Sequence, residues 1–452
     1  MPFENELASY EPLRRILDSK KVQNIKKRFK IRQSDNEDGE LSLPIIHKDK
    51  LEPSDWQPYM VIAIDGSCHL VKAENGFPGA EFGYVTVASV IIFLNKIREL
   101  ENEEFINPKE FRETEDASTI DTVFPGCNVI IDDEDSAKSS MRKALFEELK
   151  NNHVFEEGET LLDTYEVLSN IKREKHGGHP PKCPCDLKKE YEYGIGEYSC
   201  NHCGKTLYSS DALRLHELMN PEGGSSGEMF GQIMSTFERL WLIHILRAFE
   251  KRKLLPTLRR IAFMLDGPLA VFSTSSWLTK SIIDELRRLN ELAKKVNHQE
   301  LLILGIEKSG TFVNHFEDID TTKEGISDHF PNQSALLLDD EYIKKNIIFS
   351  ESEKPYGQDT YFGRKFFYKT SLGYRIVPSI AFFSEYQQDL KTAFPNQFSR
   401  LADIMNLLNQ VVSSRYKNSV SPLISAHAEA AIPLNLGRSI FEEMARELRG
   451  KS

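Results

Sequence analysis

The sequence predicts an α/β protein in which helices flank a mixed sheet. Two continuous apolar runs, 60–64 and 261–265, each end in an Asp-Gly dipeptide, and such runs are typical of strands buried on both faces of a sheet. Strands come first along the chain and strand–helix alternation follows, which indicates a mixed sheet covered by helices. The 452 residues can bury a large core and form two or three structural units.

Periodicity and turn residues place the individual elements. A Gly-rich turn at 74–79 separates the first apolar run from a β-branched, aromatic run at 82–93, so the two runs predict a β-hairpin. Helical periodicity predicts helices at 11–29, 136–151, 228–253, 277–296, 386–393, 399–413 and 437–448. Further strands are expected at 301–306, 361–369 and 374–383.

Changes in composition suggest how these elements divide into parts. Between 98 and 224 the chain becomes more charged, has fewer apolar runs and contains a stretch rich in His, Pro and Cys, which suggests an insertion. We therefore expect a core made of 55–97 and 225–436, interrupted by an insertion at 98–224 that includes a cysteine module at 176–220. A helical appendage, 1–54, precedes the core, and a C-terminal helix, 437–452, follows it.

Composition limits the class of protein. Hydrophobic residues make up 40% of the chain, and even the apolar stretch 85–94 is too short to span a membrane. The first residues lack the basic region and apolar core of a signal peptide, so we expect a cytoplasmic protein with no membrane partner. The net charge of −12 argues against a non-specific nucleic-acid coat protein, but an enzyme with a local basic groove remains possible.

Three basic stretches could contribute to such a groove. They are 20–32, 251–260 and the group of Arg364, Lys365 and Lys369. For each one alone, a solvated helix face or strand edge is the simpler interpretation.

The two Asp-Gly dipeptides supply the first candidate site. If each strand ends at its aspartate, Asp65 and Asp266 lie at the rim of the sheet, where ligands bind in α/β proteins. Two such carboxylates could hold a divalent metal ion. The simpler alternative is that each aspartate begins a turn, because Asp-Gly is a common turn dipeptide.

A third carboxylate, Glu238, is expected on the buried helix at 228–253. This helix is apolar almost all round, and an isolated carboxylate within it is costly unless it is paired or binds metal. Glu250 has Arg247 and Lys253 within one turn and is better interpreted as a solvated ion-pair former. Glu238 is therefore the stronger candidate, although pairing with a nearby Arg or Lys explains it almost equally well.

Three oxygen ligands from separate elements suit Mg²⁺ or Mn²⁺ better than zinc. Two such ions about 4 Å apart can stabilise the attacking and leaving oxygens in phosphodiester hydrolysis. The interpretation requires Asp65 and Asp266 to lie within about a nanometre of each other. Lys308, just after the strand at 301–306, could neutralise a phosphate oxygen, but a solvated lysine is commoner. His427 lies in an Ala-rich segment, where a hydrogen-bonded structural role is the usual one.

The cysteines supply a second candidate site. Cys183 and Cys185 form one close pair, and Cys200 and Cys203 form another, with a short segment rich in Tyr and Gly between the pairs. This spacing resembles a zinc ribbon, in which four thiolates close a structural zinc site. His176 and His202 are possible substitute ligands. The remaining cysteines, Cys68 and Cys127, are expected to be ordinary thiols.

Taken together, these motifs resemble the NurA nuclease family. The matching stretches follow the order of the family over 56–436: 64–67, 81–84, the helix of Glu238, 265–269, 305–309 and 426–430. The segment 207–217, after the cysteines, is similar to that of zinc-containing members. The tyrosine that the family carries shortly before the histidine has no match at 420–421, and Tyr416 is the nearest phenol.

The resemblance implies an RNase H-like core and Mn²⁺-dependent cleavage of DNA, with endonuclease and 5′-to-3′ exonuclease action. It also implies a homodimer that works with a hexameric HerA-type ATPase, in DNA end processing or antiviral defence. Asp65, Glu238 and Asp266 take the place of the family's metal ligands, and His427 that of its active-site histidine.

Two other classes of protein also fit part of the sequence. A non-catalytic adaptor would bind DNA or a partner through the zinc module. A sugar-kinase or actin-like ATPase also begins with a strand that ends in Asp-Gly, but it needs Gly-rich phosphate loops after two strands. Only the turn around Gly76 and Gly79 comes close. The sequence therefore favours the nuclease first, the adaptor second and the ATPase third.

Overall fold

The computed structural model describes residues 16–30, 44–72, 79–100, 115–132, 134–177, 182–183, 186–190, 193–321, 329–413 and 419–431. Three predicted features lie outside these ranges: the C-terminal helix, Cys185 and Tyr416. In the described part of the chain, no helix is both long and apolar enough to cross a membrane.

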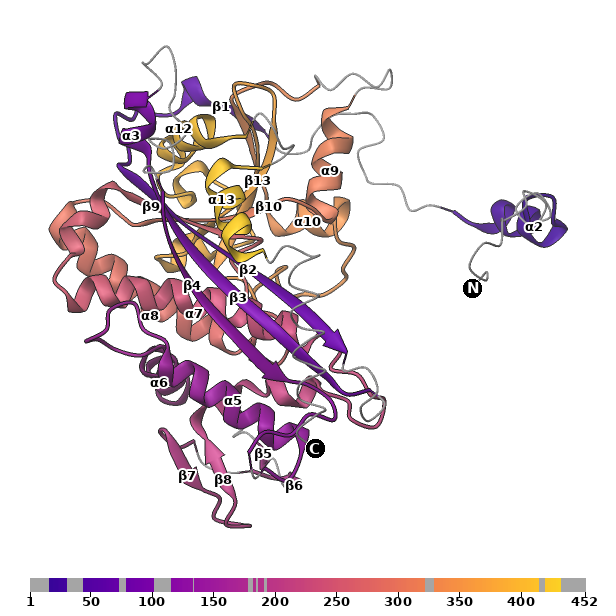
Figure 1. The fold of residues 1–452 in the computed structure, drawn as a ribbon. Helices are drawn as coiled ribbons and strands as arrows, with labels where there is room; N and C mark the ends of the chain where they lie inside the picture. Colours follow the sequence, from indigo (N-terminus) through magenta and orange to yellow (C-terminus); the bar gives the residue numbers. More distant parts are fainter. Residues whose placement is uncertain are drawn as a thin grey trace.

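A nine-stranded mixed sheet runs through the body of the protein (Figure 1). Its strands follow the order β1-β11-β12-β13-β10-β9-β2-β3-β4. Their bounds are β1 Ile45–His47, β2 Met60–Lys72, β3 Glu81–Phe93, β4 Glu115–Pro125, β9 Ile261–Asp266, β10 Leu302–Glu307, β11 Ser334–Leu337, β12 Gly363–Lys369 and β13 Arg375–Ala381. Two small two-stranded sheets, β5 Lys182–Cys183 with β6 Asp186–Glu190 and β7 Glu197–Ser199 with β8 Thr206–Tyr208, form the cysteine module.

Five strands of the large sheet have the RNase H-like arrangement. The first three, β2, β3 and β4, form an antiparallel meander. Beside β2 lie β9 and β10, and both run parallel to it. The order β4-β3-β2-β9-β10 with these directions confirms the predicted fold class. Beyond β10, the strands β13, β12, β11 and β1 extend the sheet in antiparallel pairs.

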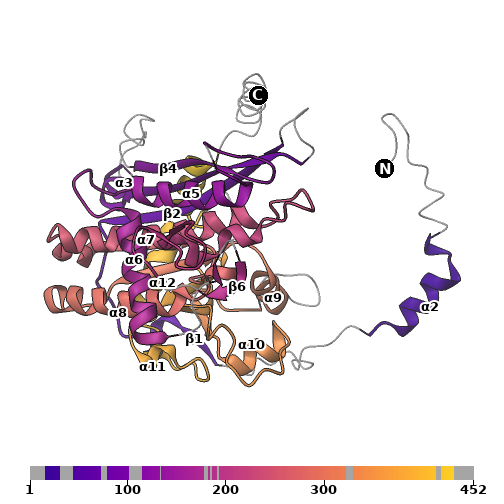
Figure 2. The same cartoon turned by 90° about the horizontal axis from the view of Figure 1, so that it is seen from below.

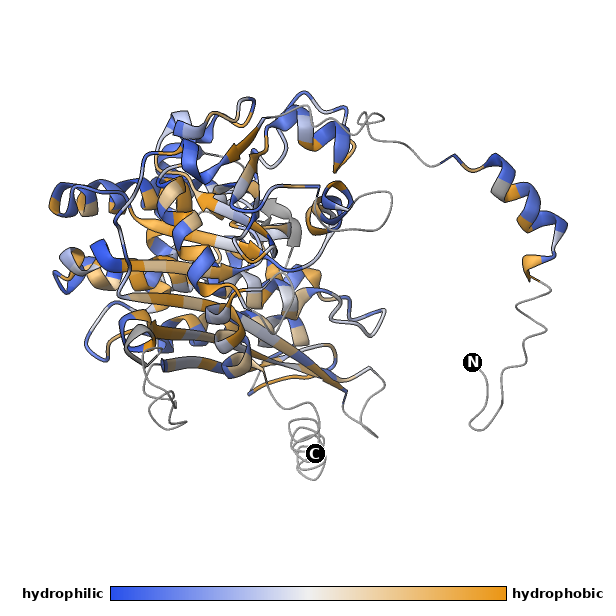
Figure 3. Cartoon of the chain, turned by 90° about the horizontal axis from the view of Figure 1, so that it is seen from above, coloured by the Kyte–Doolittle hydropathy of each residue, from blue (hydrophilic) through white to orange (hydrophobic). Residues whose placement is uncertain are grey.

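Helices cover both faces of the sheet (Figure 2). Along β2, Ile62 and Ile64 pack into the cluster beneath α7 Met229–Lys251 and α8 Leu278–Asn297. The alternate residues Val61 and Ala63 pack toward α12 Leu401–Val411 and α13 Ser421–Ala430, as expected for a strand whose side chains point to opposite faces. The strands are strongly apolar, while the helices show hydrophilic outer faces (Figure 3).

The remaining helices lie around this core. Against the α7 face pack α5 Ala137–Asn151 and α6 Leu161–Ile171. A third apolar cluster joins α9 Thr311–Asp320 and α10 Asp340–Asn346 to the antiparallel end of the sheet. Two short helices are α3 Leu94–Leu100 and α11 Glu385–Gln388. Figure 1 draws α2 Lys20–Arg28 away from the body of the protein.

Two strands of the large sheet lie within ranges that the sequence assigned to the insertion and to the N-terminal appendage. The strand β4 falls inside the range 98–224 assigned to an insertion, yet it pairs with β3 as the third strand of the RNase H-like meander. Within the predicted appendage 1–54, β1 pairs with β11 at the opposite edge of the sheet. β1 is only three residues long and β4 is largely polar. Their apolar signal in the sequence is therefore weak, and they are recognised as strands only by the strands with which they pair.

The predicted end of the first strand is wrong. Rather than stopping at Asp65, β2 continues to Lys72 and pairs with β3 along its whole length. It pairs with β9 only from Met60 to Ile64. Asp65 therefore lies where the neighbouring strand ends, not where its own strand ends, and Asp65-Gly66 is not a turn.

One predicted basic stretch is buried. The Nζ of Lys365 lies 2.5 Å from Glu307 Oε1, and the Nζ of Lys369 lies 2.8 Å from Asp320 Oδ1. Arg364 donates hydrogen bonds to backbone carbonyls and is 2% exposed. These three side chains are therefore internal and contribute no basic surface.

Candidate active site

Three parallel strands bring the predicted site residues to one edge of the sheet. In the register of β2 and β9, Ile64 lies opposite Leu265, so Asp65 and Asp266 occupy equivalent positions. In the register of β9 and β10, Asp266 lies opposite Ile306, and Lys308 follows one residue after β10 ends. Ligands bind in α/β sheets at this carboxyl edge.

Lys308 contacts both aspartates. Its Nζ lies 3.0 Å from Asp266 Oδ1 and 3.8 Å from Asp65 Oδ2. Because the two carboxylates contact one ammonium group, their oxygens can be no farther apart than these two distances together. The separation is therefore within the limit of about a nanometre that a shared pair of metal ions requires.

His427 contacts the carboxylate of Asp65 as well. It lies on α13, which packs across β2 and β3, and its Nδ1 is 3.1 Å from Asp65 Oδ2. The imidazole is 61% exposed, whereas the Asp65 side chain is 3% exposed. The histidine therefore forms the solvent-facing side of the site, and the aspartate forms its floor.

Glu238 lies on α7, against the strand that carries Asp65. A Cβ atom placed on Gly66 would lie 2.6 Å from Glu238 Oε1 and 2.6 Å from Met234 Cγ. A side chain at this position would meet the side chains of Glu238 and Met234 on α7. The glycine after Asp65 thus allows the Glu238 carboxylate to approach the strand next to the aspartate.

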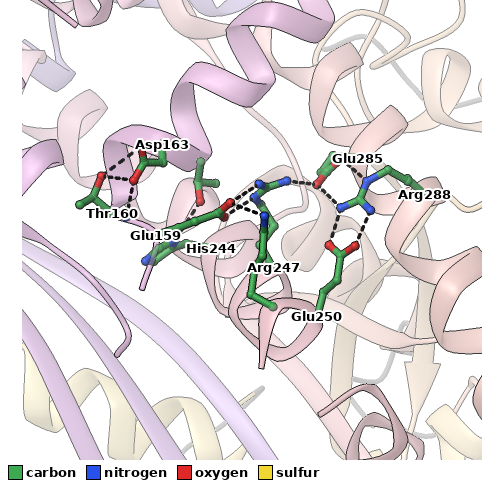
Figure 4. Close-up of polar contacts among 10 residues, drawn as sticks. Glu159, Thr160, Asp163, His244, Arg247, Glu250, Glu285 and Arg288 are labelled. Carbon is green, nitrogen blue, oxygen red and sulfur yellow. Dashed lines mark hydrogen bonds and ion pairs between the residues drawn. The ribbon is translucent and has the colours of Figure 1, made fainter. Parts of the chain in front are cut away.

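Glu250, the rejected alternative on the same helix, lies away from this edge. Its carboxylate oxygens accept hydrogen bonds of 2.7 Å and 2.6 Å from Arg288 on α8. Figure 4 shows this pair within a network that also includes Arg247, Glu159 and Glu285. The network joins α7 to α8 and to the start of α6, which is a structural role.

Burial makes Asp65 a weak acid in the metal-free protein. Loss of solvent, followed by the neighbouring charge of Asp266, raises the pKa of Asp65 from 3.8 to about 6. The charges of Lys308 and His427 and a hydrogen bond from the Gly66 N–H act in the opposite direction. A carboxylate in this environment gains stability from any further cation that binds beside it.

Internal cations already accompany the three carboxylates. Lys308 contacts the two aspartates, and Arg239 Nη1 donates a hydrogen bond to Glu238 Oε2. In the described part of the chain, these carboxylates and His427 do not form a set of three ligand atoms that all lie within 4.8 Å of one another. Among the described residues, the oxygen ligands thus do not form a closed three-ligand cage of the kind that the thiol groups form.

The cysteine module does form a closed group of ligand atoms. The Sγ atoms of Cys183, Cys200 and Cys203 all lie within 4.8 Å of one another. Cys183 Sγ is 3.4 Å from Cys200 Sγ and 3.8 Å from Cys203 Sγ. Three converging thiol groups are a donor set suited to zinc, and the fourth predicted ligand, Cys185, lies outside the described residues.

The two histidines suggested as substitute zinc ligands contact other groups. His176 Nε2 lies 3.0 Å from Asp284 Oδ2 on α8. His202 Nε2 lies 3.1 Å from the carbonyl oxygen of Glu190. Neither histidine belongs to the group of thiols.

The cysteine module is anchored to the helices of the core. Arg142 on α5 donates to both carboxylate oxygens of Asp211, at 2.7 Å and 2.6 Å. Tyr165 on α6 donates to the carbonyl of Ser209, and Trp277, just before α8, donates to that of Ala212. The module is therefore joined to the same helical layer as α7.

Arg239 is a site residue that sequence reasoning missed. It is 5% exposed and contacts Glu238 and the backbone that follows β9. The only signal in the sequence is a basic residue next to a buried carboxylate. Pairing of Glu238 with a nearby Arg or Lys was the alternative expected from the sequence, and Arg239 forms that pair. The contacts of Arg239 with the backbone around the end of β9 had no signal in the sequence.

Fold and site together define an RNase H-like protein with an acidic edge suited to divalent metal ions. The chain belongs to the NurA family, because the family model, described as the NurA domain, matches residues 60–432. The family match supports a nuclease function that acts on DNA and uses divalent metal.

Two solved structures resemble this one over nearly their whole length. The NurA nuclease from Sulfolobus solfataricus is 12% identical, with a TM-score of 0.35, and the match covers 98% of this chain and 97% of that chain. A second structure of NurA is 11% identical, with a TM-score of 0.31 and coverage of 98% of each chain. No curated protein matches the sequence.

Proposed function

We propose that this protein is a Mn²⁺- or Mg²⁺-dependent deoxyribonuclease that cleaves phosphodiester bonds at the edge formed by Asp65, Asp266 and Glu238. One observation carries the proposal: two parallel strands place Asp65 and Asp266 side by side, where both contact Lys308. Paired carboxylates at the carboxyl edge of such a sheet are the ligands that hard divalent cations prefer.

Each residue has a distinct role in this proposal. Asp65 and Asp266 would hold metal ions from the floor of the site, and Glu238 would supply a further oxygen from α7. Such ions, when bound, would supply an activated water and offset charge on the phosphate. Lys308 then pairs with a phosphate oxygen, and the exposed ring of His427 orients or protonates the substrate from the solvent side.

The biological setting that we propose follows from the family resemblance. In it the protein forms a homodimer, cuts DNA as an endonuclease and as a 5′-to-3′ exonuclease, and works with a hexameric HerA-type ATPase that moves DNA. The reaction would serve DNA end processing or antiviral defence. The assay below is therefore run both with the protein alone and with such an ATPase.

The test uses purified protein, Mn²⁺ and end-labelled single- and double-stranded DNA. We expect Asp65→Ala and Asp266→Ala to abolish cleavage while the protein stays folded. A matched pair on one helix sharpens the test: Glu238→Gln should lose activity, whereas Glu250→Gln, which disturbs only the contact with Arg288, should retain it. Undiminished cleavage by both aspartate variants would refute the proposal.

We also propose a structural zinc ion held by Cys183, Cys185, Cys200 and Cys203. Three of these thiol groups converge in the structure. A zinc module of this kind is also the feature on which a second candidate function depends. In that alternative the protein is a non-catalytic adaptor that binds DNA or a partner through the zinc module. DNA binding without cleavage, with any divalent metal and with the ATPase present, would favour the adaptor.

A further inference from the structure

Arg239 connects the helix of Glu238 to the loop that begins at Asp266. The loop leaves β9 through Gly267, whose φ of +74° turns the backbone sharply. Arg239 Nη2 donates to the carbonyl of Pro268 at 3.2 Å and to that of Asp266 at 3.4 Å. Its Nε donates to the carbonyl of Ala270 at 3.1 Å. One side chain from α7 thus binds three carbonyl oxygens of the loop.

The same guanidinium holds the carboxylate of Glu238. Its Nη1 donates to Glu238 Oε2 and, at 3.3 Å, to the carbonyl of Ser235 one turn earlier on α7. Arg239 is 5% exposed and Glu238 is 3% exposed. A planar group with five N–H donors can make this set of bonds at fixed angles, and an ammonium group cannot.

The loop after β9 is also fixed by contacts that do not involve Arg239. Its Gly267 N–H donates to the carbonyl of Ile306 at 2.9 Å, and its Leu269 N–H donates to Ser379 Oγ at 3.2 Å. On the other side, a Cβ atom on Gly305 would lie 2.6 Å from the carbonyl oxygen of Gly267. The loop is therefore packed against β10 and β13, and Arg239 is its contact with α7.

We infer that Arg239 is a positioning residue that sets the Glu238 carboxylate relative to Asp266 so that the two can bind metal ions together. The inference rests on the proposed function, since it assigns Arg239 a task only if these carboxylates bind metal. The inference assigns Arg239 no direct contact with the substrate or with the metal ions. Mutation of a residue that hydrogen-bonds to a metal ligand and orients it commonly changes metal affinity by about 10- to 100-fold.

The experiment measures Mn²⁺ binding by calorimetry, without DNA, on protein already loaded with zinc. The Mn²⁺ binding that is lost in Asp266→Asn is taken as the binding at the acidic edge. We expect Arg239→Lys, which keeps the charge but loses the planar fork, to weaken that binding by about 10-fold or more. We expect Arg239→Gln to weaken it at least as much.

Arg364→Lys is the matched control. Arg364 is also buried and also donates to three backbone carbonyls, those of Gln387, Asp389 and Thr392. Among the described residues, no carboxylate accepts a hydrogen bond from it. Both lysine variants should lower the melting temperature to a similar extent, and only Arg239→Lys should weaken Mn²⁺ binding.

Each other outcome has a separate meaning. If Arg239→Lys binds Mn²⁺ like the wild type, or if Arg364→Lys weakens binding equally, the positioning role is overturned while the nuclease proposal stands. Loss in Arg239→Gln alone would show that charge and not geometry matters, which also overturns the inference. Wild-type protein with no Asp266-dependent binding would overturn the proposed function, and the inference with it.

Discussion

The acidic edge and the cysteine cluster are two candidate metal sites with opposite construction. His427 and Asp65, which meet at the acidic edge, are 362 positions apart in the sequence. In the cysteine cluster, Cys183 and Cys203 are 20 positions apart. The first site depends on three strands and two helices, whereas the second depends on a short stretch of chain with two small hairpins.

The two sites also differ in the chemistry of their ligand groups. At the acidic edge, Lys308 and Arg239 contact the carboxylates, and their charges already offset those of the ligands. The three thiol groups of the cluster lie against one another. A site for hard cations can thus be balanced by internal cations, whereas soft thiolates depend on the metal ion itself to hold them together. Four experiments test this difference.

The largest effect is expected from Gly66→Ala at the acidic edge. The new methyl group would lie 2.6 Å from Glu238 Oε1 and from Met234 Cγ, so the side chains of Glu238 and Met234 must move, and the carboxylate moves with them. We expect cleavage to fall by more than about 100-fold, since small displacements of catalytic groups have effects of this size. Zinc content should not change.

Gly231→Ala is the control for Gly66→Ala, because Gly231 lies on α7, the helix that carries Glu238. A Cβ atom there would have nothing within 4 Å, so cleavage should stay at the wild-type rate. If Gly66→Ala cleaves DNA within a fewfold of the wild-type rate, then the close approach of Glu238 to β2 is not needed for catalysis.

Removing a thiol should act on stability instead of chemistry. We expect Cys200→Ser to lose bound zinc and to lower the melting temperature by at least about 5 °C, because metal binding at a structural zinc site contributes directly to folding. Cleavage measured well below that temperature should persist. Cys68→Ser, which alters a cysteine outside the cluster, serves as the control in metal analysis and thermal unfolding.

An unchanged zinc content in Cys200→Ser would remove this thiol from the zinc site. Loss of cleavage at low temperature would contradict the proposed separation of the two sites.

The pH dependence of Mn²⁺ binding provides the third test. The pKa of Asp65 is raised to about 6 in the metal-free protein, so this carboxyl group is protonated below that pH and must lose its proton when metal binds. Affinity should therefore decrease as the pH falls below about 6, by up to tenfold per unit. Calorimetry in buffers of different ionisation enthalpy would detect the released proton.

An affinity that stays constant between pH 7 and pH 5 would show that Asp65 does not titrate on metal binding. The raised pKa of Asp65 would then not affect metal binding at the acidic edge.

The smallest effect is expected from Lys308→Met. Its ammonium group contacts both aspartates, so it competes with a metal ion for them. Because a nearby charge shifts a carboxylate by about one pKa unit or more, we expect the variant to bind Mn²⁺ roughly tenfold more tightly. It should nevertheless cleave DNA more slowly, since no ammonium remains for the phosphate.

Lys354→Met is the control for Lys308→Met. Lys354 is an exposed lysine whose Nζ lies 2.9 Å from Asp359 Oδ2, so its removal should leave both metal binding and cleavage unchanged. Weaker Mn²⁺ binding in Lys308→Met would mean that the lysine supports the metal site and does not compete with it.

Much of the fold was predictable because its central elements carry strong periodic signals. The helices α5, α7, α8 and α12 and the strands β3, β9, β10, β12 and β13 occur where the apolar pattern placed them. Among the elements that were not predicted, β1 and β11 are short and β4 is mostly polar. The helix predicted at 386–393 is a single turn, α11, because the residues after it form a loop whose carbonyls accept from Arg364.

The candidate site divides in the same way. Two apolar runs that end in Asp-Gly were sufficient to select Asp65 and Asp266, and burial within α7 was sufficient to select Glu238. The sequence did not reveal that β2 continues past Asp65 or that Gly66 packs against a helix more than 160 positions away. It also did not reveal that Arg239 binds backbone carbonyls of a different element.

The sequence alone determined the class of fold, the type of each candidate ligand and the location of the cysteine module, because periodicity and short spacing are local properties of the chain. Only the tertiary structure decided which of the charged side chains meet. Parallel registry aligned Asp65 with Asp266, and helix packing placed Glu238 over Gly66 and Arg239 against the loop after β9. Contacts of this kind depend on distances between elements, and no local pattern encodes those distances.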